Sequence, residues 1–289
     1  MSIFQHFQSR YDEAQEECYS IQDFLSLCRN DPMAYASASQ RLLKAIGEPE
    51  MIDTSNEPCL SRIFSNRVIA RYPAFKDFYG MEEAIEQIVA YLTHASQGLE
   101  EQKQILYLLG PVGGGKSSLA EKLKSLMQQE PIYVLSANGK RSPVNDHPFC
   151  LFDANADGKI LQQEYNIPER YLSTIMSPWI AKRLHEFKGD IAKFEVIKIY
   201  PSILDQIAVA KTEPGDDNNQ DISALVGKVD IRQLEHFAQN DPDAYSYSGA
   251  LCRANQGLME FVEMFKAPIK VLHPLLTATQ EGNYNPTEG

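Results

Sequence analysis

The sequence lacks paired cysteines, long apolar runs and an excess of positive charge, and each absence excludes a class of protein. Its five cysteines are scattered without C-x-x-C spacing, which is typical of reduced thiols rather than of a disulfide framework. No apolar run approaches the roughly 20 residues that span a bilayer. No basic-then-apolar signal segment opens the chain. We therefore expect a cytoplasmic protein that does not enter a membrane.

Acidic side chains outnumber basic ones, 39 to 27, which gives a formal net charge of −12. Such a chain repels nucleic acid, so nucleic acid is not an expected partner. The short basic run Lys182-Arg183, with Lys188, is interpreted as a solvated helix face. With 289 residues, 43% of them hydrophobic, the chain has room for one large or two modest domains with a substantial core.

The sequence contains one strong motif: residues 110–117 fit G-x-x-x-x-G-K-[ST]. Its glycines let backbone N–H groups converge on a polyphosphate, the lysine reaches the β- and γ-phosphates, and the serine hydroxyl ligates Mg²⁺. The loop also opens a helix, whose unpaired N–H groups and positive dipole end face the anion. The motif predicts a nucleotide and Mg²⁺ site formed by Gly110, Gly113, Gly114, Gly115, Lys116, Ser117 and Ser118.

The surrounding pattern is the one that this motif requires. Residues 104–109 form a short apolar run stopped by glycine, typical of a buried parallel strand, and 117–129 carry apolar residues at helical spacing. Residues 132–135 are predicted as a second parallel strand that completes a β-α-β unit. These segments predict an α/β fold of the P-loop NTPase class, with a parallel sheet flanked by helices.

Elsewhere the sequence indicates mostly helices. Residues 1–70 are predicted as an N-terminal helical region, with a capping box at 20–23. A helix from Met81 to about Gln97 precedes the phosphate-binding loop. Between about 139 and 250 we expect a helical insertion with one strand at 194–199. A polar, exposed loop is expected at 212–221.

Several segments together resemble a known family. Residues 77–85 look like the segment that packs around adenine in AAA+ ATPases, and 257–263 with 275–282 look like their acidic second motif and the helix after it. More narrowly, the chain is similar to the PrkA family, described as bacterial serine protein kinases with an N-terminal AAA domain. The segments that carry this likeness are 110–118, 210–215, 219–223 and 249–257.

The resemblance implies an AAA+ ATPase core at 71–289 that binds ATP and Mg²⁺. It implies that Phe78, Tyr79 and Gly80 surround the adenine, with Lys116 and Glu263 as the catalytic residues. It further implies transfer of the γ-phosphate to water or to protein serine, a protein substrate or partner, and a homo-oligomer formed through the core. The protein-kinase motifs H-R-D and D-F-G are absent, so kinase activity is expected from the resemblance alone.

Two features depart from the AAA+ pattern. Val262 occupies the place of the usual aspartate, which leaves Glu263 to orient the attacking group and Glu260 as a candidate Mg²⁺ ligand through water. Apolar residues at 258, 261, 262 and 265 also fit a helix, so strand and helix both remain open there. The residues after Glu263 make no sensor strand, arginine finger or helical lid. The chain therefore resembles an N-terminal portion with feeble hydrolysis of its own.

A second motif is a candidate calcium site. Residues 153–164 match the calcium-loop pattern D-x-[DN]-x-[DN]-G-x₅-E, with oxygen ligands at Asp153, Asn155, Asp157 and Glu164. Nearby prolines disfavour the flanking helices of an EF-hand, and the alternative is a polar turn capping a helix that begins near Lys159. The apolar run 149–152, ending in Asp153, is also a rival for the acidic second motif.

Three functions remain open at this stage. The first is an ATP-dependent enzyme that transfers phosphate to water or protein serine. The second is a nucleotide-gated scaffold that binds ATP with little hydrolysis. The third is a remodelling ATPase of chaperone or protease type.

Overall fold

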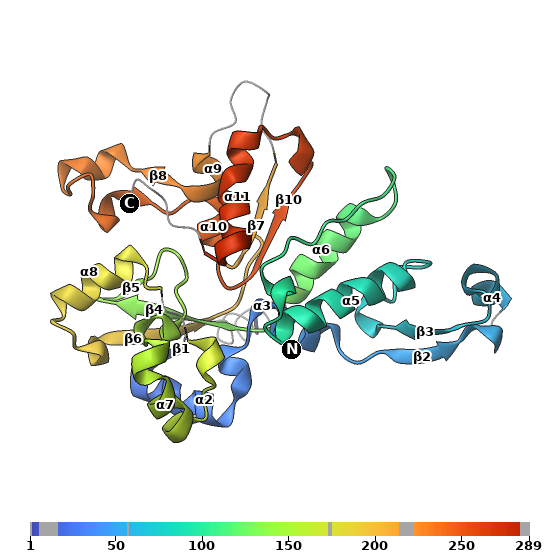
Figure 1. Cartoon of the computed structure of the whole chain (residues 1–289), viewed down its shortest axis with the longest axis horizontal. Coiled ribbons are helices and arrows are strands. Elements are labelled where there is room, and N and C mark those ends of the chain that lie inside the picture. The colour runs from blue at the N-terminus through green and yellow to red at the C-terminus, as the bar shows by residue number, and fades with distance from the viewer. Residues whose placement is uncertain (1, 6–16, 57, 173–174, 214–221, 284–289) are drawn as a thin grey trace. The chain divides into compact units, whose positions relative to one another are not determined.

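The computed structural model describes residues 2–5, 17–56, 58–172, 175–213 and 222–283 (Figure 1). The chain divides into two compact units. The first, which we call the loop unit, is Ala36–Glu130 and contains the phosphate-binding motif. The second, the sheet unit, combines Met1–Tyr35 with Pro131–Gly289. The boundary expected after residue 70 coincides with neither junction, because residues 1–70 are divided between the two units.

Three helices form the body of the loop unit: α3 (Ala38–Ile46), α5 (Glu82–Ser96) and α6 (Lys116–Met127). Helix α3 packs against both of the others. It begins in a capping box, where Ser37 accepts from the backbone of Gln40 and the Gln40 side chain accepts from the backbone of Ser37. The apolar faces of α5 and α6 are buried, through Ile85, Ile88, Val89, Leu92, Leu119, Leu123 and Leu126. The helices predicted from the sequence on both sides of the loop are therefore confirmed.

A hairpin completes the loop unit. Strands β2 (Glu50–Asp53) and β3 (Val68–Arg71) pair antiparallel, with the short helix α4 (Pro58–Phe64) between them in the sequence and at the tip of the hairpin in Figure 1. Together with β1 (Glu17–Ser20), these strands accompany the helices in the N-terminal region, and β3 runs one residue past position 70. The region that was expected to be helical thus contains strands as well as helices.

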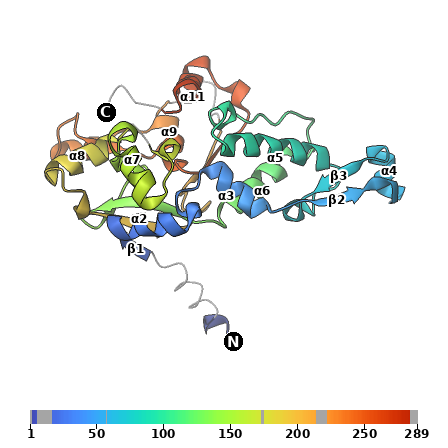
Figure 2. The same ribbon diagram turned by 60° about the horizontal axis from the view of Figure 1, so that its bottom comes forward.

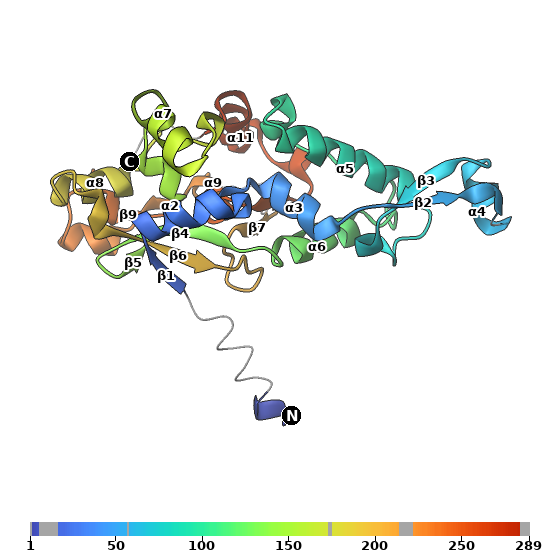
Figure 3. The same ribbon diagram turned by 90° about the horizontal axis from the view of Figure 1, so that it is seen from below.

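A four-stranded sheet with the order β1-β6-β4-β5 forms the centre of the sheet unit (Figure 3). Its other strands are β4 (Ile132–Ala137), β5 (Lys140–Arg141) and β6 (Phe194–Ile199), and every neighbouring pair is antiparallel. Helices α2 (Ile21–Asn30), α7 (Ala154–Tyr165) and α8 (Pro178–Glu186) contribute to its main core. Ser20 caps α2 by accepting from Asp23, as the capping pattern predicted, and α2 lies beside β1 in Figure 2.

The predicted β-α-β unit is not present in this structure. Strand β4 exists where it was expected, but it pairs antiparallel with β6 and β5. Residues 104–109 form no strand, and their apolar side chains are exposed, with Leu109 at 82%. All six residues of β4 are buried, since the strand has a core on each face. A continuous apolar run shows burial on both faces and does not fix the direction of the neighbouring strand.

The rest of the sheet unit contains a small parallel pair. Strands β7 (Val209–Thr212) and β10 (Leu258–Phe261) run parallel, in register from Leu258 opposite Val209. They share a core with α9 (Ser223–Val226), α10 (Ala250–Arg253) and α11 (Ile269–Glu281). A further antiparallel pair, β8 (Lys228–Val229) with β9 (Tyr245–Ser246), lies between β7 and β10 in the sequence. The strand expected at 194–199 is confirmed, and 258–261, where strand and helix were both open, is a strand. The polar segment 214–221 lies outside the described residues.

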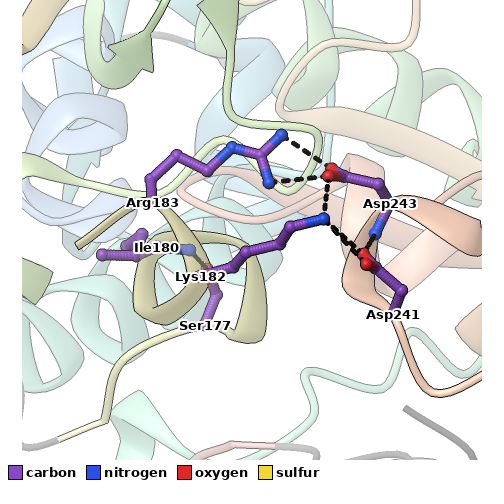
Figure 4. A network of polar contacts seen from close by, with 6 residues as sticks. All are labelled: Ser177, Ile180, Lys182, Arg183, Asp241 and Asp243. Carbon is purple, nitrogen blue, oxygen red and sulfur yellow. Dashed lines mark hydrogen bonds and ion pairs between the residues drawn. The ribbon is translucent and has the colours of Figure 1, made fainter. Parts of the chain in front are cut away.

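An ion-pair network joins α8 to the 3₁₀ turn Pro242–Ala244 (Figure 4). The Lys182 ammonium lies 2.6 Å from an oxygen of Asp241 and 2.6 Å from one of Asp243. The Arg183 guanidinium donates to both oxygens of Asp243, at 2.9 and 2.7 Å. Lys182 and Arg183 are therefore not a solvated helix face. The carboxylates that pair with them lie about 60 residues away in the sequence, so a local sequence pattern cannot reveal the pairing.

Asp243 is the centre of this network. Its side chain is 19% exposed, and that of Arg183 is 11% exposed. Burial raises the pKa of Asp243, but hydrogen bonds from Arg183 and Lys182 outweigh it and hold the pKa below its ordinary value. The carboxylate therefore stabilises the fold above the pKa of an unfolded aspartate, about 3.9. That contribution is lost as the pH falls through the lower, folded pKa.

We predict that Asp243→Asn lowers the free energy of unfolding by about 2 kcal/mol at pH 7, since it removes the carboxylate that pairs with Arg183 and one of the two carboxylates that pair with Lys182. Denaturant unfolding of the variant and the parent protein measures the difference. The matched control is Glu235→Gln, an exposed carboxylate nearby in the sequence, which should change stability by less than about 0.5 kcal/mol. Equal losses in both variants would show that the network contributes nothing specific.

No helix in the described ranges combines the length and the apolar composition needed to cross a membrane.

Candidate nucleotide-binding site

The phosphate-binding motif forms a tight loop that ends at the first residue of α6. Gly113 and Gly115 have φ values of 78° and 77°, in the left-handed region that side chains with a β-carbon rarely adopt. A β-carbon on Gly115 would also lie 2.9 Å from the Met81 sulfur. The two glycines are therefore required by the backbone path, as the motif predicted.

The cationic and hydroxyl groups of the motif gather at this turn. The Lys116 ammonium donates to the carbonyl oxygens of Gly110 and Pro111, at 2.5 and 2.6 Å. Helix α6 begins at Lys116 with no side chain capping its first backbone N–H groups. Ser117 and Ser118 are exposed on its first turn. A helix start without a side-chain cap from Gly115, an ammonium held by loop carbonyls and an accessible hydroxyl fit the phosphates and metal of a nucleotide.

A hollow in the same unit lies just before α5. It is lined by Ala70, Arg71, Tyr72, Phe75, Phe78, Glu82 and Ile85. The rings of Phe75 and Phe78 meet edge to face, with their centres 5.8 Å apart. Of the three residues expected around adenine, Phe78 lines this hollow, whereas Tyr79 is 78% exposed and Gly80 has open space beside it.

Met81 connects the hollow to the loop. Its sulfur reaches the backbone of Gly115, while the next residue, Glu82, lines the hollow. The structure thus places the predicted phosphate residues and part of the predicted base segment next to each other within the loop unit.

The acidic second motif belongs to the sheet unit. Glu260 lies on β10, and Glu263 follows that strand with a left-handed backbone, at φ 51°. This confirms the strand interpretation of 258–261 over the helical one. The Glu263 carboxylate pairs with the Lys266 ammonium at 2.6 Å, and both side chains are largely exposed. Whether Glu260 and Glu263 act with Lys116 stays a prediction, because the loop and these carboxylates lie in different units.

The calcium-loop pattern folds as a helix start. The Asp153 side chain accepts from the backbone N–H groups of Asn155 and Ala156, at 2.7 and 2.9 Å, and caps α7. Asp157 in turn accepts from the backbone of Asp153. Asn155, Asp157 and Glu164 all lie on the helix, which begins at Ala154 rather than near Lys159. No group of three or more metal-binding His, Cys, Asp or Glu side chains occurs within the described ranges. The calcium hypothesis is therefore wrong for this geometry.

The rival second motif is also wrong. Residues Pro148–Leu151 form a 3₁₀ turn in place of a strand, so Asp153 does not follow a strand end. Its carboxylate is committed to the cap of α7. Glu263, which does follow a strand, is left as the better candidate.

The family segment 249–257 has a structural role that sequence analysis missed. Gln256 donates to the carbonyls of Tyr133 and Asn145, at 2.9 and 2.7 Å, and so holds this segment against β4. A β-carbon on Gly257 would lie 1.6 Å from the carbonyl of Ala208, and one on Gly249 2.4 Å from backbone atoms of Gly227. In the sequence, the Gly, Asn and Gln residues of this segment indicate an irregular backbone, but they do not show which residues the segment contacts.

These features describe an α/β protein that carries a P-loop motif. Comparison with known proteins gives the family: residues 19–289 match the model of the PrkA AAA domain, and the chain belongs to that family. The resemblance inferred from the sequence is thereby confirmed. No solved structure matches the chain.

Two relatives show the range of names in the family. The chain is 77% identical over its whole length to "Serine/threonine kinase YeaG" of Escherichia coli strain K12, of which it covers 45%. It is 32% identical over 271 residues, or 91% of its length, to "ATP-dependent protease PrkA" of Bacillus subtilis strain 168, of which it covers 40%. The chain thus spans less than half the length of the curated relatives that it matches.

Asp153→Ala should lower the free energy of unfolding by about 1 kcal/mol, the usual loss when a helix cap is removed. Asp153→Asn should stay near the parent value, since asparagine caps as well as aspartate. Thermal unfolding of the three proteins with and without Ca²⁺ checks both statements. Calcium should leave all three transitions unchanged, and a calcium-dependent rise that Asp153→Ala removes would restore the metal site.

Proposed function

We propose that the chain is the Mg-ATP-binding part of a PrkA-type protein kinase. The observation that supports this most directly is the loop at 110–117, where two left-handed glycines, the Lys116 ammonium and the uncapped start of α6 gather. Phe78, of the segment that the resemblance places around the base, lines a small hollow in the same unit. Family membership and the name of the Escherichia coli relative support ATP and phosphoryl transfer.

In this proposal each group of the loop has a defined task. The backbone N–H groups of 113–116 hold the phosphate oxygens, and the Lys116 ammonium leaves its two carbonyl partners for the β- and γ-phosphates. Ser117 supplies the hydroxyl ligand for Mg²⁺, which would neutralise the phosphate charge when bound. Ser118 follows on the same turn as a further hydroxyl donor. Binding then depends mainly on positioned donors and positive charge.

We predict that Lys116→Ala weakens ATP binding by at least about 30-fold, because a charge-assisted hydrogen bond to each of two phosphates is lost. Titration calorimetry with Mg-ATP measures the affinity. Lys122→Ala removes the same charge from the same helix, away from the loop, and should change the affinity by less than about twofold. ATP binding that survives in the Lys116 variant would show that the loop is not the phosphate site.

The chemical step needs a group that orients the acceptor. We assign this role to Glu263, which follows β10 and forms an exposed ion pair with Lys266. Glu260, on the same strand, is proposed as the water-mediated Mg²⁺ ligand. The acceptor is a serine hydroxyl of a protein substrate or water, and a homo-oligomer formed through the core is the proposed assembly.

Glu263→Gln should slow phosphate transfer by about 100-fold or more while ATP affinity changes by less than about threefold. Labelled ATP followed onto water, the protein itself or an added protein measures the transfer. Asp153→Asn, the rival carboxylate with its cap preserved, should leave the rate unchanged. A loss in the Asp153 variant with none in the Glu263 variant would reverse the assignment.

A second candidate is an ATP-driven remodelling function. The name of the Bacillus subtilis relative, an ATP-dependent protease, favours it. This function predicts ATP-dependent higher oligomers in light scattering and label that ends only on water. Tight ATP binding without any transfer would instead favour the nucleotide-gated scaffold.

A further inference from the structure

The segment before β10 is held to the centre of the sheet unit by the side-chain amide of Gln256. This residue lies two positions before β10 and is half-buried. Its Nε2 atom donates to the carbonyl of Tyr133 on β4, at 2.9 Å, and to the carbonyl of Asn145, at 2.7 Å. Both donor hydrogens of one amide are thus used on backbone carbonyls that lie 123 and 111 residues away in the sequence.

Two further hydrogen bonds join the same pair of segments. The Asn145 amide donates to the carbonyl of Arg253 at 3.3 Å, and the Asn255 amide donates to the carbonyl of Val144 at 2.8 Å. Side chains of each segment therefore bind the backbone of the other. We call the bonds made by the amides of Asn145, Asn255 and Gln256 the amide clamp.

On one side, the amide clamp is anchored to β4 by the turn 142–146. Leu135 of β4 donates to the carbonyl of Asp146 at 2.9 Å and accepts from the N–H of Ser142 at 2.8 Å. The Asp146 side chain is buried and accepts from the hydroxyls of Ser142 and Ser177, at 2.7 Å each. The turn is therefore fixed to the central sheet and provides a firm reference for the segment before β10.

On the other side, the amide clamp leads directly into β10. Gly257 passes so close to Ala208 that a β-carbon would lie 1.6 Å from its carbonyl, and Leu258 donates to that carbonyl at 2.8 Å. Glu260 lies on the strand that begins here, and Glu263 follows it. A displacement of the start of the strand would therefore move both carboxylates.

The backbone is unusual on both flanks of β10. Gln256 has a φ of 62° and Glu263 a φ of 51°, so a left-handed residue stands two positions before the strand and another two positions after it. Side chains with a β-carbon rarely adopt this region, and they stay there where the surrounding contacts enforce it, often at functional sites. At Gln256, the two hydrogen bonds of its amide are such contacts.

We propose that Gln256 is a positioning residue for phosphate transfer. By bonding β4 and the turn 142–146, it fixes the place at which β10 starts. It thereby sets the position of Glu260 and Glu263, and the inference rests on the roles proposed above for these two carboxylates. Gln256 acts through Glu263 and contacts neither the nucleotide nor the acceptor. It therefore governs the rate of transfer, whereas ATP affinity depends on the loop at 110–117.

The test compares Gln256→Asn with the parent protein in transfer from labelled ATP and in calorimetry with Mg-ATP. Asparagine tolerates a left-handed backbone, but its amide is one methylene group too short to reach both carbonyls. Transfer should slow by about tenfold or more, because small displacements of catalytic groups are costly, while ATP affinity changes by less than about threefold. The control is Gln206→Asn, a second left-handed glutamine, exposed and bonded to Arg253, which should keep the parent rate within about twofold.

A double variant separates positioning from a general effect on the fold. If Gln256 acts through Glu263, then adding Gln256→Asn to Glu263→Gln should slow transfer by less than about twofold more. Losses that multiply in the double variant would overturn the positioning role. Equal slowing in the Gln206→Asn control would overturn it as well.

The remaining outcomes separate this inference from the proposed function. The parent rate in folded Gln256→Asn, with slow transfer in Glu263→Gln, would overturn the role of Gln256 alone. No transfer by the parent protein, or the parent rate in Glu263→Gln, would refute the proposed chemical step and this inference with it. If Gln256→Asn fails to fold, Asn255→Ala decides, because Asn255 is exposed and contributes one bond of the amide clamp. Its transfer must then slow by about threefold, and the parent rate refutes the inference.

Discussion

The left-handed backbone at Gly115 is the constraint on which the nucleotide site depends. With φ at 77°, this residue turns the chain from an irregular segment into α6, so that Lys116 becomes the first residue of the helix. The same residue leaves room for the Met81 sulfur, which a β-carbon would displace. One glycine therefore fixes the direction of the helix start and its contact with the segment before α5. The phosphate-binding and base-binding features of the loop unit are joined at that contact.

Local features of the fold could be predicted from the sequence, because local chemistry produces them. The cap at Ser20, the helices on either side of the loop and the strands at 132–137 and 194–199 all follow from spacing and capping. Pairing could not be predicted in this way. Residues 104–109 have the composition of a buried strand, yet they form no strand here, since a strand needs a neighbour that no local pattern supplies. The prediction that β4 pairs parallel with its neighbour was wrong for the same reason.

The candidate site shows the same division between local and tertiary information. The loop was predictable since its glycines encode backbone angles, which are a property of the segment itself. The calcium pattern at 153–164 contains equally specific residues, but an aspartate before a helix is also the preferred cap, and capping prevailed. A metal loop requires several oxygens to converge, whereas a cap requires one carboxylate and two N–H groups. The simpler arrangement satisfies Asp153 without any ion.

The role of each carboxylate in this chain depends on the side chains that surround it. Asp243 holds two cations, Glu83 holds one at the surface, and Glu82, beside it in sequence, is buried at the start of α5. Net charge alone could not separate these roles. The groups proposed for base and phosphate recognition lie in the loop unit, while the carboxylates proposed for the chemical step lie in the sheet unit. If these proposals hold, substitutions in the loop unit should alter affinity and substitutions in the sheet unit turnover, which separates binding from catalysis.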